Sequence, residues 1–134
     1  MGLDLFQGLP GGSDCDGTGG FVWEAGLCLA EYLIKNKAEL DLASQHIIEL
    51  GNGSGLAGIV AVLCGAPHVV LTDLDQMVPH IRQNVSLNSD RIAGKVEALP
   101  LDWDRCDQSL MSRYDLVLGA DLLYDSANGS GGRM

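Results

Sequence analysis

Residues 46–58 form the segment that most constrains how this chain can fold. The apolar run at residues 47–50 is typical of a buried strand, and residues 56–63 have the composition of a packed helix. Between them lies a turn with three glycines, Gly51, Gly53 and Gly55. Glycines in such a turn let the main chain approach a ligand closely and present backbone N–H groups to it. The segment therefore predicts an α/β domain that holds a nucleotide-like ligand at this turn.

The rest of the chain alternates between helix and strand signals. Before them lies a lead-in at residues 1–20, which is rich in Gly, Asp and Ser and is expected to be flexible. Helices are predicted at residues 22–37 and 56–63, then one that carries Pro79 in its first turn and runs to about Asn88, and a weak helix at 106–112. Strands are predicted at residues 47–50, 69–72, 95–99 and 114–120, connectors at 40–45 and 101–104, and a disordered tail at 125–134. This alternation predicts a parallel sheet with helices on both faces.

Composition and charge exclude several kinds of partner. The formal net charge of -10 leaves no electrostatic footprint for a nucleic acid. No apolar run is long enough to span a membrane. The four cysteines lie far apart without a Cys-x-x-Cys pair, so we predict a reducing compartment and neither a disulfide framework nor a metal site. We expect a cytoplasmic protein, with the nucleus as the alternative.

Polar or aromatic residues follow every predicted strand: the glycine turn, then Asp73, Trp103 and Asp121. Because the carboxyl ends of parallel strands meet at one edge of the sheet, ligands bind there, at the point where strand order reverses. Asp73 lies about 20 residues beyond the turn, where an acid typically accepts hydrogen bonds from ribose hydroxyls. Its structural alternative is to cap the next helix, although Asp75 is the better cap.

Three more side chains are candidates for the same site. Glu49 lies in an apolar strand, and a buried carboxylate needs partners, so we expect it to order the glycine turn or to face the cationic end of a cofactor. Trp103 can pack against an adenine ring, and Trp23 can close the pocket from the other side. The structural alternatives are a satisfied core carboxylate for Glu49 and ordinary core packing for the tryptophans.

Four segments, in order, carry a family resemblance: residues 18–25 (TGGFVWEA), 49–56 (ELGNGSGL), 101–103 (LDW) and 121–124 (DLLY). Together they resemble the methyltransferase-like 21 family of seven-β-strand protein-lysine methyltransferases, a group that also contains the elongation-factor-2 and valosin-containing-protein lysine methyltransferases. The resemblance extends from Thr18 to Tyr124. It implies a Rossmann-like S-adenosylmethionine-dependent methyltransferase fold, with residues 21–124 as its cofactor-binding half, and a protein substrate that is methylated on lysine.

The resemblance also implies roles for single residues. S-adenosylmethionine would lie over the glycine turn, with Asp73 on its ribose hydroxyls and Trp103 against its adenine. Asp121 and Tyr124 match the family's Asp-x-x-Tyr motif, which is associated with the target side chain. A neutral lysine amine would attack the sulfonium methyl in line while Asp121 orients it, the alternative for Asp121 being a helix cap. The predicted cofactor-binding positions are Trp23, Glu49, Gly51, Asn52, Gly53, Gly55, Asp73, Trp103 and Ala120.

The chain also departs from the family. A full member continues beyond the Asp-x-x-Tyr motif with three more strands and their helices, so we expect these carboxyl-terminal strands to be missing here. The fourth predicted strand, internal in the family, would become an open sheet edge that invites pairing with another chain. We therefore expect a truncated form that keeps most cofactor-contact positions and can be inactive alone.

Two other functions stay open. The pattern Gly53-x-Gly55-x-x-Gly58 also fits a dinucleotide fingerprint, which would indicate a fragment of an NAD-dependent oxidoreductase. The other hypothesis is a non-catalytic binding module that pairs through its open edge. Within the methyltransferase hypothesis, a small molecule or a protein amino terminus is the alternative to lysine as methyl acceptor.

Overall fold

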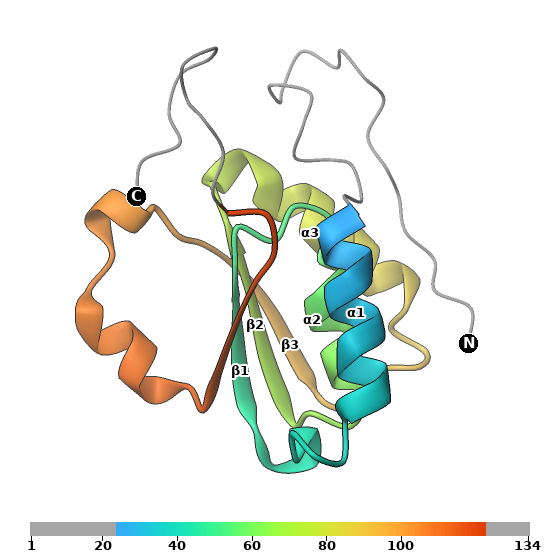
Figure 1. The fold of residues 1–134 in the computed structure, drawn as a ribbon. Helices are drawn as coiled ribbons and strands as arrows, with labels where there is room; N and C mark the ends of the chain where they lie inside the picture. The colour runs from blue at the N-terminus through green and yellow to red at the C-terminus, as the bar shows by residue number, and fades with distance from the viewer. Residues whose placement is uncertain (1–23, 123–134) are drawn as a thin grey trace.

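The computed structural model describes residues 24–122 (Figure 1). The predicted lead-in and tail, together with Trp23 and Tyr124, lie outside this range. Three α-helices are described, α1 (Glu24–Asn36), α2 (Leu56–Leu63) and α3 (Val78–Leu87). The strands are β1 (His46–Leu50), β2 (His68–Asp73), β3 (Lys95–Pro100) and β4 (Leu116–Gly119). Short 3-10 helices lie between them: η1 (Leu42–Ser44), η2 (Asp75–Met77), η3 (Trp103–Arg105) and η4 (Gln108–Arg113).

The four strands form one parallel sheet in the order β3-β2-β1-β4, which confirms the predicted parallel sheet. In register, Ile47 of β1 lies opposite Val69 of β2 on one side and Leu116 of β4 on the other. The chain proceeds from β1 outward to β3 and then crosses back to β4, so the strand order reverses between β1 and β4. The carboxyl ends of these two strands are therefore the place where this fold binds ligands.

All three α-helices pack on one face of the sheet. One core cluster joins Leu33 of α1, Ile59 of α2 and Ile81 of α3 to alternate strand residues such as Ile47 and Leu71. The sequence had predicted helices on both faces. Since crossovers between parallel strands are right-handed, the connection from β3 back to β4 runs over the opposite face, where Figure 1 shows residues 101–115 in orange.

The opposite face carries 3-10 turns in place of the predicted helix at residues 106–112. Asp107 directly precedes η4, and its side chain accepts a hydrogen bond from the Ser109 backbone N at 2.9 Å, so it caps the start of a 3-10 helix. Only the single-turn helix η3 and the longer 3-10 helix η4 form there within the described residues.

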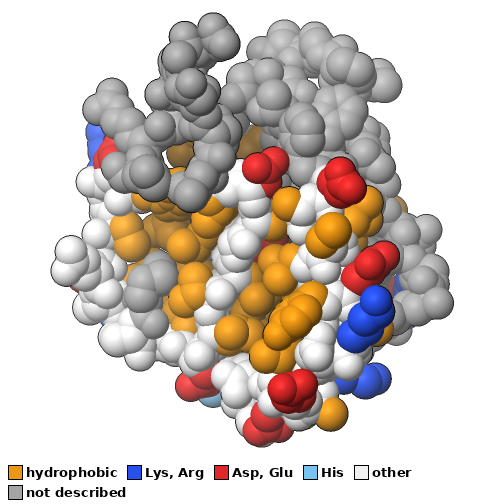
Figure 2. Space-filling model, viewed as in Figure 1, with side chains coloured by type: hydrophobic (Ala, Val, Ile, Leu, Met, Phe, Trp, Pro, Cys, Tyr) orange, Lys and Arg blue, Asp and Glu red, His pale blue; other side chains and the backbone are white. Residues whose placement is uncertain are grey.

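The surface combines acidic side chains with scattered apolar ones. Figure 2 shows hydrophobic side chains lying among charged ones on the face seen in Figure 1. The exposed apolar residues of α1 are Leu27, Tyr32 and Ile34, and Val117 of β4 is 46% exposed. In the described residues β4 pairs with β1 alone, and the predicted open edge stays a prediction. None of the described helices is long and apolar enough to cross a membrane.

Candidate functional site

The glycine turn leads from β1 into α2 through three left-handed residues. Gly51, Gly53 and Gly55 have φ values of 57°, 58° and 84°, which L side chains rarely adopt. Gly55 is the N-cap of α2 and has no side chain to cap the helix, so the first N–H groups of α2 need other partners. The backbone of Asn52 anchors the turn, because its N donates to the Thr72 carbonyl of β2 at 3.1 Å.

Asp73 connects the glycine turn to the end of β2. Its Oδ2 accepts a hydrogen bond from Gly53 N at 2.8 Å, and its Oδ1 accepts one from Leu74 N at 2.7 Å. The side chain is half-buried at the carboxyl end of the strand. Neither Asp73 nor Asp75 caps a helix with its side chain: the N-caps of η2 and α3 are Leu74 and Met77, without side-chain caps. The prediction that Asp75 is a cap was therefore wrong, because a one-turn 3-10 helix begins at that residue before α3.

Glu49 lies beneath the turn and is only 3% exposed. Its Oε2 accepts hydrogen bonds from Gly58 N of α2 at 2.8 Å and from Asn52 Nδ2 at 3.2 Å. Burial raises the pKa of Glu49 to about 8, against the lowering effect of these two hydrogen bonds, and the charge of Asp73 raises it further. Of the two predicted roles, the structure supports ordering of the turn, because Glu49 supplies the missing acceptor for the amino end of α2.

Asn52 joins Glu49 to the turn and is itself 9% exposed. Its Nδ2 donates to Glu49, whereas its buried Oδ1 has no hydrogen-bond partner within the described residues. A buried amide oxygen without a partner has a cost in free energy, which a bound group that donates a hydrogen bond would remove.

Two polar residues that the sequence reasoning missed also hold the turn. Thr72 Oγ1 donates to the Glu49 carbonyl at 2.6 Å, and Asn84 Nδ2 of α3 donates to the Ser54 carbonyl at 2.7 Å. Thr72 and Asn84 are at most 2% exposed. A sequence signal for Asn84 existed, because it lies three residues after Ile81 and so falls on the apolar face of α3.

Trp103 lies against the glycine turn. A Cβ atom added to Gly51 would lie 3.1 Å from Trp103 Cζ2 and 2.8 Å from Leu122 Cδ2, so both side chains cover this glycine. Trp103 remains 38% exposed and belongs to η3, whose N-cap Asp102 accepts a hydrogen bond from Asp104 N. The segment predicted as a connector at residues 101–104 thus contains one turn of 3-10 helix. Leu122 was not predicted as a site residue.

Two more predicted site residues follow β4. Ala120 is half-buried, and Asp121 is exposed with a left-handed φ of 55°. Since β4 lies beside β1, these residues stand on the same edge of the sheet as the glycine turn. Trp23 and Tyr124 fall outside the described residues, so their predicted roles stay predictions.

The carboxyl edge of the sheet therefore combines a glycine turn, a half-buried carboxylate and an indole ring. The carboxylate oxygens of Asp73 each accept one hydrogen bond and can accept another from a hydroxyl group. Within residues 24–122, no group of three or more His, Cys, Asp or Glu side chains could hold a metal ion. This arrangement is suited to bind the ribose and base of a nucleoside.

Comparison with known proteins identifies related sequences. A model of the lysine methyltransferase family matches residues 12–129. The chain is 39% identical over 103 residues to EEF1A lysine methyltransferase 3 from Xenopus tropicalis, covering 77% of this chain and 44% of that protein. It is 38% identical over 109 residues to protein N-lysine methyltransferase METTL21A from the same organism, covering 81% of this chain and 49% of the relative. The chain thus spans about half the length of these relatives.

Among solved structures, magnesium protoporphyrin IX methyltransferase from Synechocystis, with bound SAH, has the same fold. The TM-score is 0.54 at 19% sequence identity, and the match covers 70% of this chain and 41% of that one. The likeness confirms the predicted Rossmann-like methyltransferase fold.

Proposed function

Because the chain belongs to the lysine methyltransferase family, we propose that it binds S-adenosylmethionine as the cofactor-binding part of a protein-lysine N-methyltransferase. The observation that carries the proposal is the hydrogen bond from Gly53 N to Asp73 Oδ2, which fixes a glycine turn against a carboxylate at the switch point of the sheet. The names of the two relatives give a protein lysine as the methylated group. The family match does not favour the dinucleotide alternative.

The described residues fit this cofactor. Asp73 would accept the ribose hydroxyls, and the Trp103 ring would pack against the adenine. The unpartnered Oδ1 of Asn52 supports a site whose hydrogen bonding is completed only on binding. When bound, the cofactor supplies a methyl group activated by a positively charged sulfur. Glu49 would act indirectly, by holding Asn52 and the first turn of α2 in place.

Binding over Gly51 would require two side chains to move. Trp103 and Leu122 occupy the space next to this glycine, and a ligand placed there would displace them. Neither side chain belongs to the packed core cluster, so we expect both to rotate at little cost in packing energy. Trp103 would then be free to stack on the bound base.

Asp121 is our candidate for orienting the methyl acceptor. Its carboxylate is exposed at the end of β4, beside the strand that leads into the glycine turn. A lysine is protonated at neutral pH and must lose a proton before its nitrogen can act as a nucleophile. Asp121 would accept a hydrogen bond from this nitrogen and favour the geometry of attack.

Replacing Asp73 by alanine is the direct test of the cofactor site. We expect Asp73→Ala to weaken binding of S-adenosylhomocysteine about tenfold or more, because it removes the anchor of Gly53 and a charged acceptor for the ligand. Isothermal titration measures this affinity, with NAD as a control ligand.

Two matched variants complete the test. Asp75→Ala removes an equal charge two residues away, where the side chain caps no helix, and should bind normally. Asp121→Ala should also keep its affinity, while lowering methyl transfer to a protein lysine. Normal binding by Asp73→Ala, together with loss of binding by Asp121→Ala, would show that the roles are assigned wrongly.

A further inference from the structure

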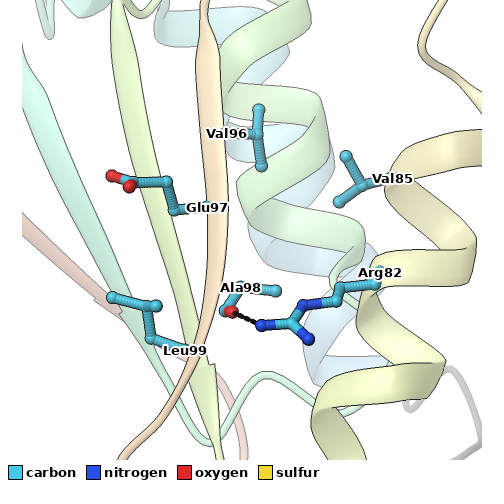
Figure 3. A pocket seen from close by; sticks show the side chains of 6 residues that line it. All are labelled: Arg82, Val85, Val96, Glu97, Ala98 and Leu99. Atoms are coloured by element: carbon cyan, nitrogen blue, oxygen red, sulfur yellow. Dashed lines mark hydrogen bonds between the residues drawn. The ribbon is translucent and has the colours of Figure 1, made fainter.

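A groove follows the outer edge of the sheet, between β3 and α3 (Figure 3). It encloses about 300 Å³, close to the lower limit of typical ligand sites. Figure 3 shows Val85 and Arg82 of α3 facing Val96 and Ala98 of β3 across the groove. The remaining lining residues, Glu97 and Leu99, lie on the far side of the strand. None of these six residues belongs to the site at the glycine turn.

The backbone of β3 offers unpaired groups to this groove. Lys95 N donates to the Pro67 carbonyl and Leu101 N to the Asp73 carbonyl, so odd-numbered residues direct their N–H groups toward β2. Because these directions alternate along a strand, Val96 and Ala98 direct their backbone groups outward. No strand of residues 24–122 pairs with that side of β3. Such an edge is a template for adding another strand.

Arg82 places a positive charge on the α3 side of the groove, across the strand from Glu97. Its Nη2 donates to the Ala98 carbonyl at 3.2 Å, the dashed line in Figure 3. A guanidinium has five N–H donors, so most of its donors remain for another acceptor. No carboxylate within residues 24–122 forms an ion pair with Arg82. A carboxylate is the acceptor that fits this planar group best.

We propose that this groove binds an extended, acidic peptide segment of a partner protein, which adds as a strand to β3 and places a carboxylate on Arg82. Val96 N–H and C=O and Ala98 N–H would pair with the peptide backbone. Apolar side chains two residues from the carboxylate would pack beside Val85. A second copy of this chain fits less well, since joining two β3 edges about a twofold axis would bring two Arg82 guanidinium groups to the same face of the joined sheet.

A short synthetic peptide tests the proposal. The probe is the capped pentapeptide Val-Thr-Glu-Thr-Val, in which Glu and both Val side chains share one face of a strand. Amide NMR should show shifts and new exchange protection at Val96 and Ala98. The amides of Lys95, Glu97 and Leu99 should keep their protection unchanged, because β2 already pairs with them. The capped control Val-Thr-Lys-Thr-Val should bind at least about tenfold more weakly.

Protein variants test whether peptide binding depends on the charge at the groove or on the net charge of the protein. Arg82→Gln should weaken binding of the glutamate peptide about tenfold, whereas Arg113→Gln, in η4, should leave it unchanged. Arg82→Lys preserves the charge and replaces Arg82→Gln in this binding test if Arg82→Gln does not fold. Equal binding of the two peptides, or protection spread evenly along β3, would overturn the proposal. Protection of Val96 and Ala98 that rises with protein concentration without peptide would overturn it in favour of a dimer.

Discussion

Replacing Gly58 by alanine is expected to destabilise the fold by about 3 kcal/mol or more. An added Cβ would lie 2.0 Å from Leu71 Cδ2 and 2.7 Å from Glu49 Oε2, both far inside van der Waals contact. Leu71 is fully buried and Glu49 nearly so, which leaves neither side chain room to move aside. The clash would also break the hydrogen bond from Gly58 N to Glu49 that supports the start of α2.

Urea denaturation measures this loss, and Gly26→Ala is its matched control. Gly26 lies in α1, and a Cβ added there meets no atom within 4 Å. Alanine is the better helix former, so this variant should gain about 0.5–1 kcal/mol. If the two substitutions changed the free energy of unfolding in the same direction, close packing of α2 on the sheet would not explain why residue 58 is a glycine.

The second large effect is a pH dependence that comes from Glu49. Its pKa is raised to about 8 by burial, from an ordinary value of 4.5 in the unfolded chain. Between these two pH values the unfolded chain releases a proton that the folded chain keeps, so the free energy of unfolding falls as pH rises. Above about pH 8, Glu49 is ionised in the folded protein as well, and the folded state then bears the full free-energy cost of a buried carboxylate. We expect this effect to reach a few kcal/mol.

Glu49→Gln should remove this pH dependence while keeping a hydrogen-bond acceptor for Gly58. The comparison is the difference between wild type and variant in urea midpoint at pH 5, 7 and 9, which cancels the effect of the other acidic groups. Glu97→Gln supplies a contrast of opposite sign when the same comparison is extended to pH 3: the hydrogen bond from His68, followed by that from Lys95, lowers the pKa of Glu97, so its contribution is lost as pH falls below about 4.5. A constant difference between wild type and Glu49→Gln at all three pH values would contradict the assignment.

The sequence predicted those parts of the fold and site that depend on local signals. The glycine turn, α2 and the four strands were recognisable from composition and periodicity, and Asp73 from its distance along the chain. Thr72 and Leu122 were missed because their contacts with Glu49 and Gly51 depend on strand register and on the path after β4. The helix predicted at residues 106–112 forms as the 3-10 helix η4, because Asp107, Ser109 and Ser112 are residues that favour caps and turns over the interior of an α-helix.

The place of β4 in the sheet has a consequence for how the protein unfolds. β4 pairs with β1, from which it is separated by most of the described chain: Asp115, just before β4, accepts a hydrogen bond from His46 N 69 residues earlier. Closing so long a loop is slow, and a four-residue edge strand contributes little to hold it closed. β4 should therefore open as a separate unit, and amide exchange at Leu118, on the side that pairs with β1, should precede that at Ile47 and Val70, which pair within the β1–β2 ladder. Such an opening would carry Asp121 away while the glycine turn and Asp73 stay folded, so the proposed cofactor site would outlast the geometry proposed for methyl transfer.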